Sequence, residues 1–278
     1  MTRKEQLFFC KKCIHRKNNI QKGIICELTN ESANFTDKCS DFILDEDAKT
    51  VSTNSIRPNK ERADIAIKLI WLVMLIEIIS AISSFFQYKL LNEVNDGGFV
   101  SEQAANANDT REQIIAIVYL IVFIISGITF IQWFRRAYYN LGVRTKCKHT
   151  EGWAAGAWFV PIISLFRPVQ IMNELWDKTS KLISEKTNTP KSPITAMIGL
   201  WWTLWIIIHF VGRYVTKSGF KAETVEEYIN STIGDMVISI LGIPLAIVTV
   251  LIVKSYSKKE EKLSEIEKQM LEEDLTNN

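Results

Sequence analysis

Apolar residues in this chain are gathered into long blocks separated by polar and charged stretches. A soluble fold would instead spread its apolar positions at the period of a helix or a strand. Four blocks are long enough to cross the roughly 30 Å hydrocarbon core of a bilayer: residues 64–86, 114–134, 194–215 and 234–253. The pattern therefore predicts an all-α membrane protein with four transmembrane helices, the last of them kinked at Pro244.

Two further segments lie between the second and third predicted spans. Residues 152–166, GWAAGAWFVPIISLF, are too short for a full crossing and are flanked by positive charge, which favours a re-entrant or interfacial segment. Residues 169–185 predict an amphipathic helix that either lies in the headgroup plane or packs on the protein's own membrane domain. Its apolar face is Val169, Met172, Leu175, Trp176, Leu182 and Ile183.

A cysteine-rich segment, residues 1–43, precedes the first span with the spacing C-x2-C-x12-C-x12-C. A C-x2-C turn lets two thiolates face one tetrahedral ion, and two more cysteines complete a closed site. So short a segment buries little apolar surface, so a bound ion would supply most of its stability. The spacing predicts a small four-cysteine zinc module with the ligands Cys10, Cys13, Cys26 and Cys39.

The same cysteines have other interpretations. They could form two disulfides or remain unliganded, and His15 could replace one ligand, although a solvated histidine is expected there. Residues 1–6 are polar and charged and do not resemble a secretion signal, so we expect the module in the reducing cytosol, where thiols favour metal. Four thiolates leave no open position for water, so the expected zinc is structural rather than catalytic.

The parts around the membrane domain are polar. Residues 44–63 predict a linker, residues 64–255 the membrane domain, and residues 256–278 a charged helical tail. The tail is expected to be solvated, although Leu263, Ile266 and Met270 form a narrow apolar stripe that is too short to predict a coiled coil. Lys and Arg accumulate on the side of a membrane that is cytosolic. With four spans and both termini in the cytosol, the opposite side carries only Lys89, Arg111, Arg213, Lys217 and Lys221. The expected location is therefore the inner (cytoplasmic) membrane of a bacterium.

Two polar residues fall inside the predicted spans. Glu77 and His209 lie at similar distances from the cytosolic ends of the first and third spans, about 20 Å in at 1.5 Å per residue. A carboxylate in lipid needs a partner, and a histidine can provide one. The two residues could thus form an ion-responsive pair or a structural hydrogen bond. At the cytosolic surface, Arg135, Arg136 and Arg167 are expected to contact anionic lipid headgroups or an anionic ligand.

The central stretch resembles a bacterial multi-pass membrane family known as domain of unknown function 4328. The resemblance lies in FIQWFRRAYYNL (residues 130–141), in GWAAGAWFVPIISLFRPVQIMNELW (residues 152–176), and in the spans around them, roughly residues 64–255. It implies a four-span domain with cytosolic termini. The family has no assigned activity and no site residues to transfer, and the cysteine module lies outside it as a fused segment.

The net charge and the absence of known catalytic motifs narrow the set of functions that the sequence predicts. A net charge of +2 gives no reason to expect nucleic-acid binding. The chain carries no P-loop, nucleophile elbow, H-E-x-x-H or dinucleotide glycine pattern, so no enzyme is predicted. Besides the bilayer, the expected partner is a cytosolic protein bound by the cysteine module or the tail. The leading hypothesis is a non-enzymatic scaffold or sensor, and the alternative is a small transporter or channel component that uses Glu77 and His209.

Overall fold

The computed structural model describes residues 3–19, 22–45, 56–190 and 196–276. The chain divides into two compact units, Met1–Arg57 and Pro58–Asn278. In the first unit, helix α1 (Arg3–Cys10) precedes strands β1 (Arg16–Asn19) and β2 (Gly23–Cys26). The strands are antiparallel, and an isolated bridge joins Cys13 to Leu44. The unit therefore reaches slightly beyond the predicted boundary at residue 43.

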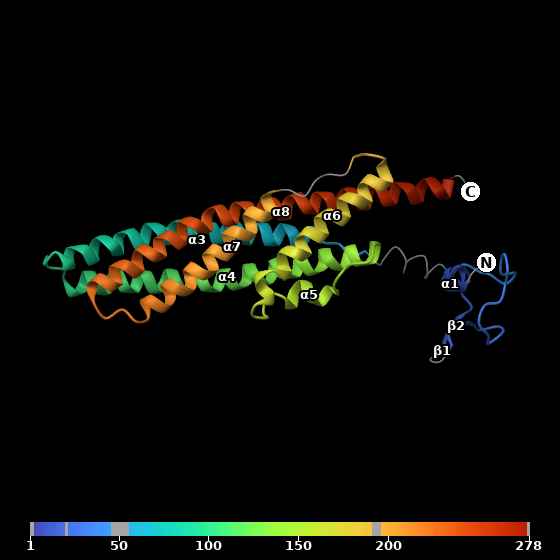
Figure 1. Cartoon of the computed structure of the whole chain (residues 1–278), viewed down its shortest axis with the longest axis horizontal. Helices are drawn as coiled ribbons and strands as arrows, with labels where there is room; N and C mark the ends of the chain where they lie inside the picture. Colours follow the sequence, from blue (N-terminus) through green and yellow to red (C-terminus); the bar gives the residue numbers. More distant parts are fainter. Residues whose placement is uncertain (1–2, 20–21, 46–55, 191–195, 277–278) are drawn as a thin grey trace. The chain divides into compact units, whose positions relative to one another are not determined.

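Four helices dominate the second unit: α3 (Lys60–Asn95), α4 (Glu102–Arg144), α7 (Ala196–Gly219) and α8 (Val225–Thr276) (Figure 1). All four are long and apolar enough to cross a membrane, which confirms the number and the approximate positions of the predicted spans. The helices extend beyond the predicted ends. Between α3 and α4, for example, the predicted polar loop shortens to six residues, 96–101, and the Ser101 side chain caps α4 by accepting from the amide of Ala104 at 3.2 Å.

The four long helices have a definite order. Helix α8 packs along both α3 and α7, and α3 also packs against α4. Helices α4 and α7 have no extended contact with each other. Large aromatic side chains rather than close backbone packing join α4 to α7: Phe130 of α4 contacts Trp201 of α7 at a centroid distance of 6.2 Å.

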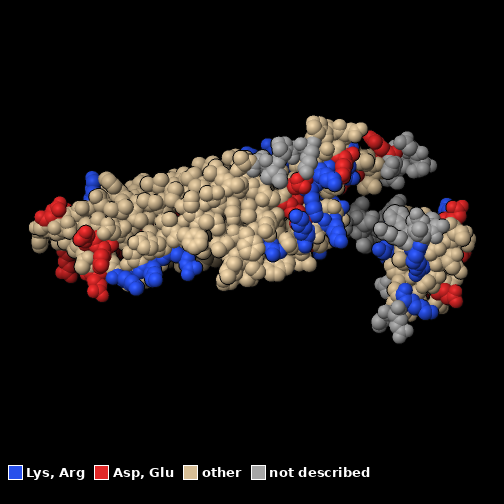
Figure 2. Space-filling model, in the orientation of Figure 1, with Lys and Arg blue, Asp and Glu red and all other residues tan. Residues whose placement is uncertain are grey.

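The middle of this unit has an apolar surface. The most apolar window of α4 is only 6% buried, and Ile117, Leu120 and Ile124 of that helix are more than half exposed. Figure 2 shows a broad band of the helical unit without charged side chains, with Lys, Arg, Asp and Glu gathered toward its ends. So large an apolar surface is typical of a protein whose solvent is lipid.

Helix α8 extends far beyond a bilayer. Its 52 residues make a helix of about 78 Å at 1.5 Å per residue, more than twice the thickness of the hydrocarbon core. The prediction that residues 256–278 are solvated is wrong for the first part of this segment, because Tyr256 and Leu263 are each 1% exposed. Helix α6 (Arg167–Thr187) packs against this part of the unit through contacts with α8 and α4.

The two segments predicted between the second and third spans are a set of short helical turns and helix α6. Residues 152–166 contain the short helix α5 (Glu151–Gly156) and the 3-10 turn η1 (Ile163–Leu165), so they do not form a fifth spanning helix. The Trp202 indole of α7 donates to the Leu165 carbonyl at 3.0 Å. The apolar face of α6 includes Met172 and Leu175, both 0% exposed. Of the two interpretations of this helix, the structure supports packing on the protein's own helices.

Candidate functional site

The four cysteines of the first unit surround one cavity. Cys10 ends α1, Cys13 lies in the bridge to Leu44, Cys26 ends β2, and Cys39 lies in the following loop. All four line a cavity of about 210 Å³, which His15 also lines. Phe9 supports it with edge-on contacts to Phe35 and Phe42, at centroid distances of 6.3 and 6.0 Å. The fold thus brings together the cysteines that the spacing grouped.

The thiols interact without being bonded to one another. All five cysteines are described, and each is free, so neither of the two disulfides considered from the sequence is present. Burial raises the pKa of the Cys10 thiol, and the neighbouring Cys39 and Cys13 raise it further. Among the described residues, no group of three or more His, Cys, Asp or Glu side chains has converged to metal-binding geometry. The structure thus brings four free thiols to one cavity, and zinc binding by them stays a prediction.

Inside the membrane domain, Glu77 has a partner that the sequence analysis missed. The Tyr119 hydroxyl of α4 donates to Glu77 Oε1 at 2.8 Å, and the Ser239 side chain of α8 also hydrogen-bonds to this carboxyl group. Glu77 is 5% exposed. Helix α8 passes very close at Gly242, where an added Cβ would lie 2.8 Å from Glu77 Oε1. A tyrosine within the second span was the available signal, but its direction depends on how α4 is rotated.

His209 does not join Glu77. Its ring stacks on Trp205, with a centroid distance of 5.2 Å, and meets Phe210 edge-on at 5.7 Å. No hydrogen bond or ion pair between Glu77 and His209 occurs in the part of the chain that the structure describes. The physical reason is the helix order, since α8 packs between α3, which carries Glu77, and α7, which carries His209. The directly bonded pair predicted from equal depth is therefore not formed.

Glu77 instead lines a cavity among the four long helices. The cavity has a volume of about 300 Å³ and lies inside the apolar part of the unit. Its acidic wall carries Glu77 and Tyr119, and its aromatic wall carries Trp201 and Trp205 of α7 with Trp158, which follows α5. Trp158 contacts both α7 rings edge-on, at centroid distances of 6.3 Å to Trp201 and 5.8 Å to Trp205.

The three arginines predicted at the membrane surface all have partners within the protein. Arg135 forms an exposed ion pair with Glu151 at 2.9 Å, and Arg136 reaches the Pro58 carbonyl at 3.5 Å. Arg167 lies 2.8 Å from His149 Nδ1. Burial, and then the charge of Arg167, lower the pKa of His149, which fits a neutral ring accepting from the guanidinium. Contact of these arginines with lipid headgroups stays a prediction.

Buried polar groups join the helices beyond the apolar band, near α6. Glu260 of α8 accepts from Asn59 at 3.1 Å and from Asn140 of α4 at 2.6 Å. Glu174 of α6 accepts from the Tyr138 hydroxyl at 2.7 Å and forms an ion pair with Lys178 at 2.6 Å. Burial alone would raise the pKa of Glu174, but these hydrogen bonds and one from the Lys148 amide outweigh it and lower the pKa.

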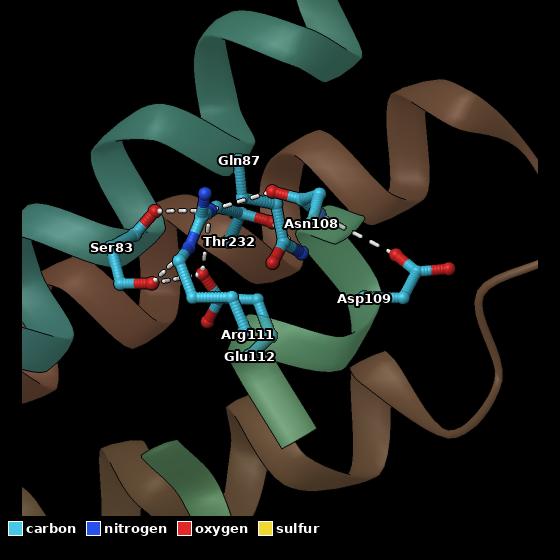
Figure 3. Close-up of polar contacts among 7 residues, drawn as sticks. All are labelled: Ser83, Gln87, Asn108, Asp109, Arg111, Glu112 and Thr232. Atoms are coloured by element: carbon cyan, nitrogen blue, oxygen red, sulfur yellow. Dashed lines mark hydrogen bonds and ion pairs between the residues drawn. The ribbon is translucent and has the colours of Figure 1, made fainter. Parts of the chain in front are cut away.

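A second cluster of polar side chains lies where α3 ends and α4 begins, at the other end of the apolar band (Figure 3). The Arg111 guanidinium donates to Ser83 Oγ at 2.8 Å and to Asn108 Oδ1 at 2.6 Å, and it forms an ion pair with Glu112 at 3.2 Å. Gln87 of α3 donates to Thr232 of α8 at 3.2 Å, so the same end also includes α8. The apolar band with its cavity is thus bounded by polar side-chain contacts at both ends.

These features define a helical protein with four helices able to cross a membrane, extended by a helical bundle beyond them. A family model described as domain of unknown function (DUF4328) matches residues 96–258, which is more than half of the chain, so the protein belongs to this family. The match begins after α3, later than the resemblance suggested, and leaves the cysteine module outside. No curated protein and no solved structure matches the chain.

Proposed function

We propose that this protein is a non-enzymatic membrane sensor or scaffold whose N-terminal module holds one structural zinc ion and binds a cytosolic partner. The observation that carries the sensor part of the proposal is the continuity of α8. This helix runs from the apolar band, where Gly242 touches Glu77, to Glu260, where it binds Asn59 and Asn140. Because α8 is one continuous helix through Pro244, its movement would alter contacts at both places.

The zinc ion is supported by the donor set of the first unit. Cys10, Cys13, Cys26 and Cys39 are the ligands proposed, because they line one small cavity and four thiolates are a donor set of closed structural zinc sites. The ion would fasten together a unit whose regular structure is one short helix and one two-stranded sheet among the described residues. A fixed surface of this kind is suited to binding another protein.

Partner binding and solute movement are the two functions to be separated. The full chain and a Cys13→Ser/Cys26→Ser variant would be cross-linked in the native membrane, and a Cys147→Ser variant would serve as the control. A scaffold should lose one defined partner in the double variant and keep it in the control. A partner retained by the double variant would contradict the proposal, as would solute flux through the purified, reconstituted chain.

A further inference from the structure

The cavity between the four long helices has the composition of a site for a positively charged amphiphile. Its volume of about 300 Å³ lies at the lower end of the range for small-molecule sites. The chain offers one carboxyl group there, Glu77, and no Lys, Arg or His side chain lines the cavity among the described residues. The described contacts of Glu77 are with Tyr119 and Ser239, both uncharged groups. The cavity thus presents an acid without a cationic partner from the protein.

The indole rings of the cavity are suited to a cation as well. Trp158, Trp201 and Trp205 line the cavity. Trp205 is fixed by stacking on Trp202 at a centroid distance of 4.7 Å and on His209 at 5.2 Å, so the faces of Trp158 and Trp201 are the ones that a cation would contact. The face of an indole attracts an ammonium group, and it does so more strongly when water is excluded. A carboxyl group and indole rings in one cavity are the two kinds of group that bind a quaternary or protonated amine.

The position of the cavity favours a ligand that dissolves in the bilayer. The cavity lies within the apolar part of the unit and is lined by residues of all four long helices. An anionic lipid would place a negative charge near Glu77. A neutral acyl chain would gain no charge attraction from the carboxyl group. A compact lipophilic cation satisfies both walls at once.

We propose that this cavity binds a lipophilic ammonium ion, with Glu77 as the counter-charge and Trp158, Trp201 and Trp205 as the aromatic wall. Tyr119 and Ser239 orient the carboxylate through their hydrogen bonds. Where Glu77 carries a proton before binding, the ion displaces that proton to solvent, so the charge of the site is unchanged. Gly242 leaves the space that this carboxyl group occupies.

Two probes of the same shape test the proposal. Benzyltrimethylammonium carries one positive charge, and neopentylbenzene is its uncharged isostere. Binding of each to the full chain in lipid nanodiscs would be measured by saturation-transfer NMR and by titration calorimetry. We expect the cation to bind at least about tenfold more tightly, because it gains both the ion pair and the cation–π contacts.

Variants then test whether the preference for the cationic probe depends on Glu77. Glu77→Gln should remove the preference for the cation while neopentylbenzene still binds, which shows that the cavity is intact. Glu112→Gln, a carboxyl group outside the cavity, should keep the preference. Should Glu77→Gln not fold, Trp201→Leu should lower cation binding at least about threefold. Equal binding of the two probes to the native chain, or an unchanged preference in Glu77→Gln or in a folded Trp201→Leu, would overturn the proposal.

Discussion

Asn140 of α4 donates its side-chain amide to Glu260 of α8 at 2.6 Å, across 120 positions of sequence. Asn59, just before α3, donates to the other carboxylate oxygen at 3.1 Å. All three residues are buried. One carboxylate therefore joins the start of α3, the end of α4 and the extension of α8.

Replacing this carboxylate should destabilise the bundle. Glu260→Ala leaves two buried amides without their acceptor, so we expect a loss of about 1–3 kcal/mol in the free energy of unfolding. The neighbouring Glu261 forms an exposed ion pair with Lys60 at 2.8 Å, and Glu261→Ala should cost less than about 1 kcal/mol. Unfolding of the detergent-solubilised chain, followed by tryptophan fluorescence, compares the two. Equal losses would show that Glu260 does not hold the helices together.

The close approach of α8 to Glu77 gives a second prediction. A methyl group at Gly242 would lie 2.8 Å from the carboxylate oxygen, so Gly242→Ala must displace Glu77 or part the helices. We expect a loss of about 1–3 kcal/mol, typical of overpacking. Gly199→Ala in α7 is the matched control, because nothing lies within 4 Å of its added Cβ, and it should be neutral or slightly stabilising. If Gly242→Ala and Gly199→Ala have equal free energies of unfolding, the contact between Gly242 and Glu77 is not a close one.

Metal content tests the cysteine module. We expect one zinc ion per chain in the purified native protein, measured by elemental mass spectrometry, and a loss of that zinc in Cys13→Ser/Cys26→Ser. Cys147, which lies in the other unit, provides the control, and Cys147→Ser should keep the ion. A native chain without zinc, or a double variant that retains it, would contradict the assignment of these ligands.

The contact between His149 and Arg167 predicts a dependence on pH. Burial and the charge of Arg167 hold the pKa of His149 below its ordinary value of 6.5 in the folded protein. The unfolded chain therefore binds the proton first, and the free energy of unfolding should fall as the pH drops below about 6.5. The slope from this residue is at most about 1.4 kcal/mol per pH unit, reduced by solvent because the ring is only partly buried. His149→Asn should melt with a shallower dependence between pH 6.5 and 5, and an unchanged slope would exclude this contribution.

The sequence predicted the spans better than it predicted the helix ends. Apolar blocks follow from residue type alone, which is why all four spans could be located. The extensions of α4 and α8 are polar, and their packing depends on partners such as Asn140 and Glu260 that are distant in the sequence. A charged helix that packs against a distant partner has the same local pattern as a solvated one, so the tail was assigned to solvent.

The sequence identifies Glu77 as a candidate site residue but not its partners, because those partners also depend on how distant helices pack. Glu77 stood out because a carboxyl group is rare in a span. Its pairing with His209 was inferred from depth, which says nothing about the order of helices around a bundle. The structure places α8 between the two helices and turns Tyr119 toward Glu77 instead. The aromatic wall also depends on Trp158, which lies in a segment whose short helices have no clear period.

The threading of the chain underlies the proposed cytosolic zinc module and its partner, and it can be measured directly. All five native cysteines lie in segments that we assign to the cytosol, whereas Phe99 and Phe220, 89% and 88% exposed, lie in the two loops assigned to the opposite side. A membrane-impermeant maleimide would be applied to intact and to permeabilised spheroplasts that express the chain. We predict that the native protein is labelled only after permeabilisation and that Phe99→Cys and Phe220→Cys are labelled in intact spheroplasts. Labelling of the native cysteines from outside, or protection of both introduced ones, would contradict the account.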